Sequence, residues 1–301
     1  MRLVTYSPAA GGAPRPGLVV EGNRIVDIPA CVAPVAGIDF STMLGIIRGG
    51  EPALRALESL VSRAPAAAGS VAMVDVKLAA PIPRPAKNVF CVGWNYREHF
   101  EEGAKNLQGS VELPRWPVFF SKAVTAVTGP FDRIPFDASI STCLDWEVEL
   151  GVVIGPGGKN IRPEEATGHI WGYTAINDLS WRDLQRRHGG QWHKGKSLDG
   201  TCPMGPVLVT AESLDPGNLR VTCRVNGVTK QDSNTRFLHF TLPRLVQELS
   251  LGMTLEAGDI ISTGTPAGVG FARTPPEFLK PGDILETEVE GIGVMRNPIG
   301  E

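Results

Sequence analysis

The apolar residues of this chain fall mostly in short runs that glycine and proline separate, a pattern typical of β-strands. Strands are predicted at residues 3–6, 18–20, 24–28, 88–92, 118–121, 146–154, 171–177, 206–209, 220–228, 259–263 and 284–290. Helical patterns are fewer: 51–63 is the longest, and short helix-compatible stretches cover 97–103 and 180–187. Turn residues such as Asn226-Gly227 punctuate the runs. We therefore expect a largely antiparallel or mixed β core instead of regular βαβ winding.

The chain is expected to divide near residue 80. An Ala/Gly-rich segment begins at Ala64, and prolines follow at positions 81, 83 and 85. Proline fixes φ and stops a helix, so this stretch predicts a boundary. At 301 residues the chain is long enough for a large domain and a small one. We expect a small N-terminal α+β domain at 1–80 and a β-rich α+β domain at 81–301.

Charge and composition exclude several classes of protein. The 29 basic and 32 acidic residues give a net charge of −3 and are spread out, so a nucleic-acid partner is not expected. No segment offers about 18 consecutive apolar residues, and no basic region precedes a long apolar run. This predicts a cytoplasmic protein without a membrane partner. The five cysteines form no CxxC pattern, so neither a disulfide framework nor a thiolate zinc site is expected.

Alternating carboxylates begin the run DWEVELGVVIG, from Asp145. Side chains alternate across a strand, so Asp145, Glu147 and Glu149 would share one face, with neighbouring carboxylates roughly 7 Å apart at Cα. An isolated pair of this kind is more often a solvated strand face. The apolar residues 150–154 instead predict burial on both faces, where like charges need a counter-ion. An all-oxygen set favours Mg²⁺, Mn²⁺ or Ca²⁺ over zinc.

Asp178 offers a further carboxylate, at the end of a predicted strand. An Asp in this position is more often a helix N-cap. Arg182 and Gln185 follow at i+4 and i+7, so all three would share a helical face that could bind a carboxylate-bearing ligand. A surface salt bridge between Arg182 and Asp178 explains this spacing equally well.

His99 and Glu102 stand three residues apart in the helix-compatible stretch 97–103. Most such pairs are ordinary exposed neighbours. A carboxylate beside an imidazole would also raise its basicity and fix its tautomer, as a general base acting on water requires.

Two glycine-rich segments invite an anion-binding interpretation. Residues 190–197, GQWHKGKS, match the Walker A pattern literally. A charged helix-like run precedes them instead of a buried strand, and Pro203 follows too soon for the long helix of a P-loop, so this class is disfavoured. Residues 262–270, STGTPAGVG, could bind an anion through backbone N–H groups, but a plain turn between strands is the simpler interpretation.

Several motifs, taken in order, resemble those of the fumarylacetoacetate hydrolase family. They are NYREHFEE, DWEVELGVVIG, NDLSWRDLQ, GKSLD, STGTPAGVG and LKPGDILETEVEGIG, between about residues 88 and 297. The resemblance implies a mixed β-sandwich or roll catalytic domain and a homodimer. It assigns a divalent metal to Glu147, Glu149 and Asp178, with Asp145 outside this set as a residue that orients a neighbour. It also implies a lid that carries a catalytic His99/Glu102 dyad, a catalytic Lys196, and substrate contacts at Arg182, Gln185 and Thr265.

The function that this resemblance implies is a metal-dependent hydrolase of a small oxo-acid. It would cleave a C–C bond in an acylpyruvate-type substrate and release pyruvate or a related 2-oxo acid, in catabolism of aromatic compounds or sugar acids. Water activated by His99/Glu102 would attack the distant ketone, and Lys196 would stabilise the enolate oxygen. The same enolate chemistry serves an oxaloacetate decarboxylase, a 2-hydroxydienoate isomerase or a related lyase. From other classes, a P-loop module and a non-catalytic oxo-acid binder remain as alternatives.

Overall fold

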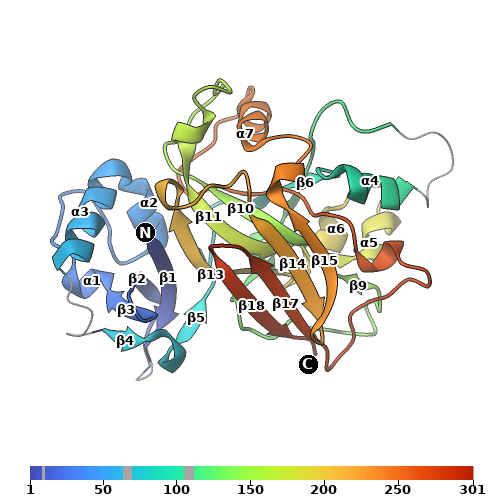
Figure 1. Ribbon diagram of the computed structural model, residues 1–301, viewed down its shortest axis with the longest axis horizontal. Helices are drawn as coiled ribbons and strands as arrows, with labels where there is room; N and C mark the ends of the chain where they lie inside the picture. Colours follow the sequence, from blue (N-terminus) through green and yellow to red (C-terminus); the bar gives the residue numbers. More distant parts are fainter. Residues whose placement is uncertain (9–10, 64–69, 105–111, 301) are drawn as a thin grey trace.

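Strands dominate the computed structural model, which describes residues 1–8, 11–63, 70–104 and 112–300 (Figure 1). The strands are β1 (Arg2–Ser7), β2 (Arg15–Val20), β3 (Arg24–Asp27), β4 (Val71–Ala72), β5 (Lys77–Ala79), β6 (Val89–Gly93), β7 (Val118–Lys122), β8 (Val127–Thr128), β9 (Leu144–Asp145), β10 (Val148–Ile154), β11 (Ile170–Asn177), β12 (Ser180–Trp181), β13 (Cys202–Thr210), β14 (Arg220–Val225), β15 (Val228–Asn234), β16 (Ile260–Ser262), β17 (Ile284–Val289) and β18 (Gly293–Pro298). The α-helices are α1 (Ile28–Cys31), α2 (Met43–Arg48), α3 (Gly50–Arg63), α4 (Arg97–Ala104), α5 (Arg182–Arg187), α6 (His193–Lys196) and α7 (Leu242–Ser250). Every helix in the described part of the chain is too short or too polar to span a membrane.

Two β-sheets form the body of the molecule. The larger has twelve strands, with the main order β4-β3-β2-β1-β13-β11-β10-β16-β6-β7, and the smaller runs β15-β14-β17-β18. Most neighbours are antiparallel, while β16 pairs with β6 and β13 with β8 in parallel. The prediction of a β-rich α+β fold with a mixed, largely antiparallel core is confirmed.

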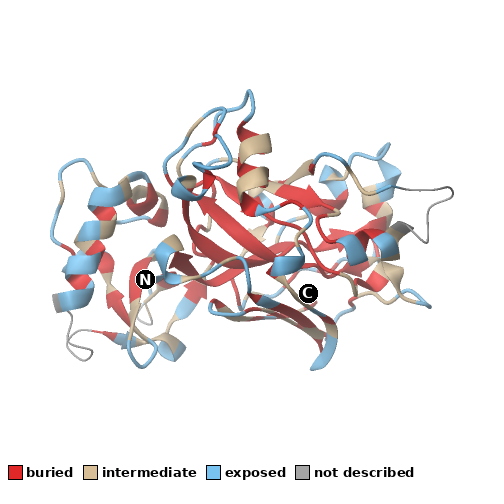
Figure 2. Ribbon diagram, turned by 45° about the horizontal axis from the view of Figure 1, so that its top comes forward, coloured by how far each residue is buried: buried red, intermediate tan, exposed pale blue. Residues whose placement is uncertain are grey.

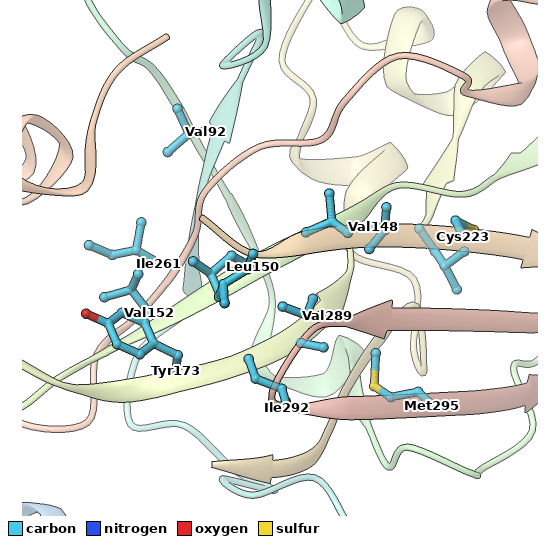
Figure 3. Close-up of a cluster of buried hydrophobic side chains, with 14 of the residues drawn as sticks. Val92, Val148, Leu150, Val152, Tyr173, Cys223, Ile261, Val289, Ile292 and Met295 are labelled. Carbon is cyan, nitrogen blue, oxygen red and sulfur yellow. The ribbon is translucent and has the colours of Figure 1, made fainter. Parts of the chain in front are cut away.

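The hydrophobic core between the sheets follows from side-chain alternation on β10. Val148, Leu150 and Val152 point toward the smaller sheet, where they meet a cluster that includes Val289 and Met295 (Figure 3). Burial of such side chains stabilises the fold by roughly 1.5–3 kcal/mol each. All seven residues of β10 are buried, as the apolar run predicts, and the central strands form a continuous buried layer (Figure 2).

The opposite face of the large sheet carries a second cluster, to which the first 80 residues contribute. Leu3, Ile46 and Leu57 from this part pack in one cluster with Val153 and Trp171. Strand β1 also pairs with β13, so the large sheet runs through both parts of the chain. Figure 1 shows α1, α2 and α3 gathered at this end of the sheet. The division at residue 80 stays a prediction.

Two predicted strands have different bounds in the structure. The strand predicted at 146–154 begins only at Val148, because Trp146 and Glu147 lie between β9 and β10. The run 220–228 ends in the turn Asn226-Gly227, whose φ angles of 53° and 75° suit a tight hairpin, and β15 follows. Helix α7 and strand β18 were not predicted.

Candidate active site

A cavity of about 490 Å³ collects most of the predicted site residues. It lies between α4, β10, α5, α6 and the loop that follows β16. The predicted residues that line it are His99, Glu147, Glu149, Arg182, Gln185, Lys196 and Thr265. Glu102 and Asp178 do not line the cavity themselves, but each contacts a residue that does.

Three buried carboxylates meet at the floor of the cavity, where Glu147 and Glu149 belong to the lining and Asp178 lies just outside it. Glu147, Glu149 and Asp178 each offer an oxygen within 4.8 Å of the other two. Backbone contacts bring Glu147 and Asp178 together, because the N–H of Asp178 donates to the carbonyl of Glu147 at 2.8 Å. The side-chain oxygen of Asn177 accepts from the N–H of Glu147 at 2.9 Å and fixes the break before β10.

Three cations surround two of these carboxylates. Lys196 Nζ lies 2.6 Å from Glu147 and 2.7 Å from Asp178. Arg182 contacts Glu147 at 2.7 Å, and Lys122 contacts Asp178 at 2.9 Å. Burial alone would raise the pKa of Glu147, but Lys196 and Arg182 outweigh it and lower that pKa to about 2. Glu147 is therefore a permanent anion at neutral pH.

Glu149 differs from its two neighbours because it forms no ion pair with any described residue. Its Oε2 accepts from the Ser262 hydroxyl at 2.6 Å and the Gly264 N–H at 2.8 Å. Burial, Asp178 and Glu147 together raise its pKa well above the usual value. A buried carboxylate without a counter-ion is costly, and a bound cation would remove that cost. This all-oxygen donor set therefore fits a hard divalent cation.

The predicted His99/Glu102 pair forms on α4. His99 Nδ1 lies 2.9 Å from Glu102 Oε1, and the second carboxylate oxygen accepts from the Gly268 N–H at 2.9 Å. His99 is 6% exposed and lines the cavity. Because Nδ1 is held by Glu102, Nε2 is the nitrogen left for a ligand.

The glycine-rich segment after β16 is more than a plain turn. Its backbone N–H groups bind the site's own carboxylates: Gly264 donates to Glu149 and Gly268 to Glu102. Gly270 donates to Asp145 at 2.6 Å. The preferred interpretation of a plain turn is therefore incomplete, because the segment binds anions that are the protein's own carboxylates. The Thr265 hydroxyl is also engaged, since it donates to the carbonyl of Val148 and accepts from the Gln231 amide.

Three interpretations based on the spacing of Asp178 are wrong. Helix α5 begins only at Arg182, so Asp178 neither caps it nor shares a helical face with Arg182 and Gln185. Arg182 pairs with Asp145 at 2.8 Å and with Glu147, and it is buried, so it forms no surface salt bridge with Asp178. The Nη1 of Arg182 donates to the Gln185 amide oxygen at 3.2 Å. Asp145 thus orients Arg182 and lies outside the carboxylate triad.

The Walker-like segment has none of the architecture of a P-loop. Its helix, α6, has four residues, and Lys196 Nζ is buried between two carboxylates that would repel a phosphate. The positive charge persists, because Asp178 and Glu147 outweigh burial and raise the pKa of Lys196 above its usual value.

Several residues of the site gave no recognisable signal in the sequence. Lys122, at the end of β7, is fully buried against Asp178 and the carbonyl of Leu179. Trp94 and Trp192 form an aromatic wall with Phe120, in edge-to-face contacts of 5.2 and 5.1 Å between ring centroids. Trp94 has a φ of 57°, which is unusual for a large residue. The wall joins three segments that are distant in sequence, so only the fold reveals it.

The site combines buried carboxylates, the cations that pair with them, and a histidine that a further carboxylate holds in place. This combination suits acid–base chemistry with a divalent cation and a small anionic ligand. The family model described as fumarylacetoacetate (FAA) hydrolase C-terminal matches residues 88–300, and the chain belongs to this family of enzymes.

Relatives of this chain include enzymes named oxaloacetate tautomerase. YisK of Bacillus subtilis is 48% identical over 227 residues, which cover 75% of this chain and 74% of that protein. The mitochondrial FAHD2A of Bos taurus is 41% identical over 303 residues, covering 99% of this chain and 91% of that protein.

Solved structures of family members share the whole fold. Fumarylacetoacetate hydrolase from Exiguobacterium antarcticum is 37% identical, with a TM-score of 0.82 and coverage of 100% of this chain and 99% of that one. Maleylpyruvate hydrolase from Sphingobium sp. SYK-6, determined with manganese(II) and pyruvate, is 28% identical, with a TM-score of 0.78 and the same coverage.

Proposed function

We propose that this protein is a divalent-metal-dependent tautomerase that interconverts the enol and keto forms of oxaloacetate or a closely similar 2-oxo dicarboxylate. One observation carries the proposal: the hydrogen-bonded pair His99 and Glu102 and a buried triad of carboxylates meet at the same cavity. Relatives named for this reaction span nearly the whole chain. They favour tautomerisation over the C–C hydrolysis that the motifs first suggested.

The reaction moves one proton and consumes no water. In the direction from enol to keto, the proton of the 2-hydroxyl leaves its oxygen, and a proton adds to carbon 3. A divalent cation held by Glu147, Glu149 and Asp178 would supply positive charge that acidifies the hydroxyl. Lys196 stays an ammonium and adds charge stabilisation where negative charge develops on oxygen.

His99 is the group that carries a proton to or from carbon 3. Glu102 accepts from Nδ1 and so fixes the tautomer, which leaves Nε2 free to exchange a proton with a ligand in the cavity. The aromatic wall formed by Trp94, Trp192 and Phe120 limits the entry of water on one side of the cavity. By limiting access of water, this aromatic wall favours proton transfer to carbon over attack by water.

The test is to follow the loss of the enol absorbance after enol-oxaloacetate is mixed with the protein, with Mg²⁺ and with EDTA. We expect loss much faster than the spontaneous rate with Mg²⁺, and a return to that rate with EDTA. Release of carbon dioxide from oxaloacetate, and of pyruvate from fumarylpyruvate and acetylpyruvate, should be much slower. Dominant carbon dioxide release would favour a decarboxylase.

The second candidate function is hydrolysis of an acylpyruvate. The His99/Glu102 pair favours it, because the same pair can activate water, and a structural neighbour is a maleylpyruvate hydrolase. Pyruvate release from acylpyruvates faster than enol loss would support this candidate. The expected homodimer stays a prediction that light scattering can test.

A further inference from the structure

We propose that Arg186 binds the second carboxylate of the substrate and makes the cavity selective for dicarboxylates over monocarboxylates. This inference rests on the proposed function, since it names the feature by which the same site selects its substrate.

The argument starts from the charges around the cavity. Three residues with a permanent positive charge line it: Arg182, Arg186 and Lys196. Arg182 is neutralised by Asp145 and Glu147, and Lys196 by Glu147 and Asp178. Arg186 forms no ion pair with any residue in the described part of the chain. It is therefore the lining cation whose charge is left for a ligand.

The position of Arg186 suits the far end of a short diacid. Arg182 and Arg186 are one turn apart on α5, about 6 Å along the helix axis. Arg182 is 6% exposed and touches the carboxylate floor, while Arg186 is exposed at the solvent end of the cavity. A ligand with one carboxylate at the floor would extend its second carboxylate toward Arg186.

Phe271 holds the Arg186 guanidinium in place. The Arg182 guanidinium lies 4.4 Å from the centre of the Phe271 ring, and that of Arg186 lies 5.5 Å from the same centre. The backbone N–H of Phe271 donates to Asp145 at 3.0 Å, so the main chain that carries the ring is anchored. Stacking on a fixed ring reduces the conformational entropy that a long side chain would lose on binding a ligand. A guanidinium can then bind a carboxylate through two N–H groups.

Arg187 provides a matched control. It is the next residue on α5 and is also exposed, but it does not line the cavity and instead lies 3.5 Å from Asp183. If surface charge in general caused a preference for dicarboxylates, replacing either arginine would weaken it similarly. If a specific contact causes it, only replacement of Arg186 would weaken it.

The experiment measures binding of two unreactive ligands to the Mg²⁺-loaded protein by calorimetry. L-malate and L-2-hydroxybutyrate differ only in a terminal carboxylate against a methyl group, and neither undergoes keto–enol exchange. The proteins compared are the wild type, Arg186→Gln, Arg186→Lys and Arg187→Gln. Enol-oxaloacetate turnover is measured on the same samples.

We expect the wild type to bind L-malate at least about tenfold more tightly than L-2-hydroxybutyrate, as a charge-assisted contact predicts. Arg186→Gln should reduce this ratio to about threefold or less and leave the affinity for L-2-hydroxybutyrate unchanged. Arg186→Lys should retain part of the ratio, and Arg187→Gln all of it. In turnover, Arg186→Gln should raise KM more than it lowers kcat.

Two results would overturn the inference: no preference for L-malate in the wild type, or full retention of the preference in Arg186→Gln. Failure of the proposed function gives a different pattern, in which the preference depends on Arg186 but the wild type does not accelerate enol loss. The two failures can therefore be separated.

Discussion

The Glu102 carboxylate accepts a hydrogen bond from the backbone N–H of Gly268 at 2.9 Å, and this contact ties α4 to the glycine-rich loop after β16. The same loop binds Glu149 through the N–H of Gly264 and Asp145 through that of Gly270. One short segment thus positions the proposed acid–base pair, a carboxylate of the proposed cation site and the partner of Arg182. A change in this loop would disturb all three together.

Replacement of His99 by alanine should separate proton transfer from cation binding. Turnover of enol-oxaloacetate should fall by about 10² to 10⁴, the usual contribution of a positioned acid–base group. Mg²⁺ and oxalate should bind as in the wild type, because the carboxylates remain. Glu102→Gln should lose less turnover than His99→Ala, since the amide oxygen of the new side chain can still accept a hydrogen bond from His99 or Gly268. Calorimetry and initial rates check both variants, with His169→Ala as a control outside the cavity. Activity of His99→Ala within about threefold of the wild type would exclude this role.

Glu149→Gln should weaken cation binding and increase the stability of the metal-free protein. The pKa of Glu149 is raised in the folded protein, so the folded state holds a proton that the unfolded chain releases. The metal-free wild type should therefore lose stability as the pH rises from the unfolded pKa through the raised folded one. The amide removes this loss and should raise the free energy of unfolding of the metal-free protein at neutral pH by about 1 kcal/mol.

Urea unfolding with and without Mg²⁺ measures this effect, and calorimetry measures the affinity. Mg²⁺ should stabilise the wild type and the control variant Glu286→Gln, whose carboxylate pairs with Arg224 away from the cavity. It should hardly stabilise Glu149→Gln. Equal Mg²⁺ affinity in Glu149→Gln and wild type would rule out Glu149 as a ligand.

Lys122→Met should destabilise the protein although Lys122 does not line the cavity. The substitution leaves Asp178 buried without one of its two cations, and breaking a buried ion pair costs about 3–5 kcal/mol. Lys77→Met is the matched control, because Lys77 is exposed and its pair with Asp132 should contribute less than about 1 kcal/mol. Urea titration compares the two variants. Similar midpoints would show that Lys122 is dispensable.

Lys196→Ala should reduce turnover of enol-oxaloacetate, and ATP binding should be absent both before and after the substitution. The wild type should show no saturable ATP binding at micromolar concentrations, because two carboxylates surround the Lys196 ammonium. Equilibrium dialysis with labelled ATP checks this. Saturable binding that Lys196→Ala abolishes would restore the P-loop interpretation.

Sequence patterns predicted the strands well but not the break that shapes the site. Alternation placed Glu147 and Glu149 within a continuous strand, whereas Glu147 lies between β9 and β10. The N–H of Glu147 donates to the Asn177 side chain and that of Val148 to the Gln231 side chain. These amides come from distant segments and replace the usual strand contacts. Such a break has no local signal.

Local spacing rules also failed for residues whose contacts depend on tertiary position. Asp178 precedes Arg182 by four residues, and local rules assign that spacing to a helix. The two-residue strand β12 comes between them and turns Arg182 toward Asp145. Lys122 is a lone cation after an apolar run, and Arg186 is one of two adjacent arginines. Neither the burial of Lys122 nor the place of Arg186 in the cavity could be inferred from spacing.

The hydrophobic cluster that joins Leu3, Ile46 and Leu57 to Val153 and Trp171 has a consequence for how the molecule unfolds. Neither part of the chain can lose this packing without exposing apolar surface of the other. We therefore expect thermal melting to show one cooperative transition, with the calorimetric enthalpy equal to the van't Hoff enthalpy. Two resolved transitions would mean that the first 80 residues unfold independently. A single transition would mean that the active site unfolds together with the first 80 residues. Destabilising mutations near Ile46, far from the cavity, would then lower the temperature at which the active site unfolds.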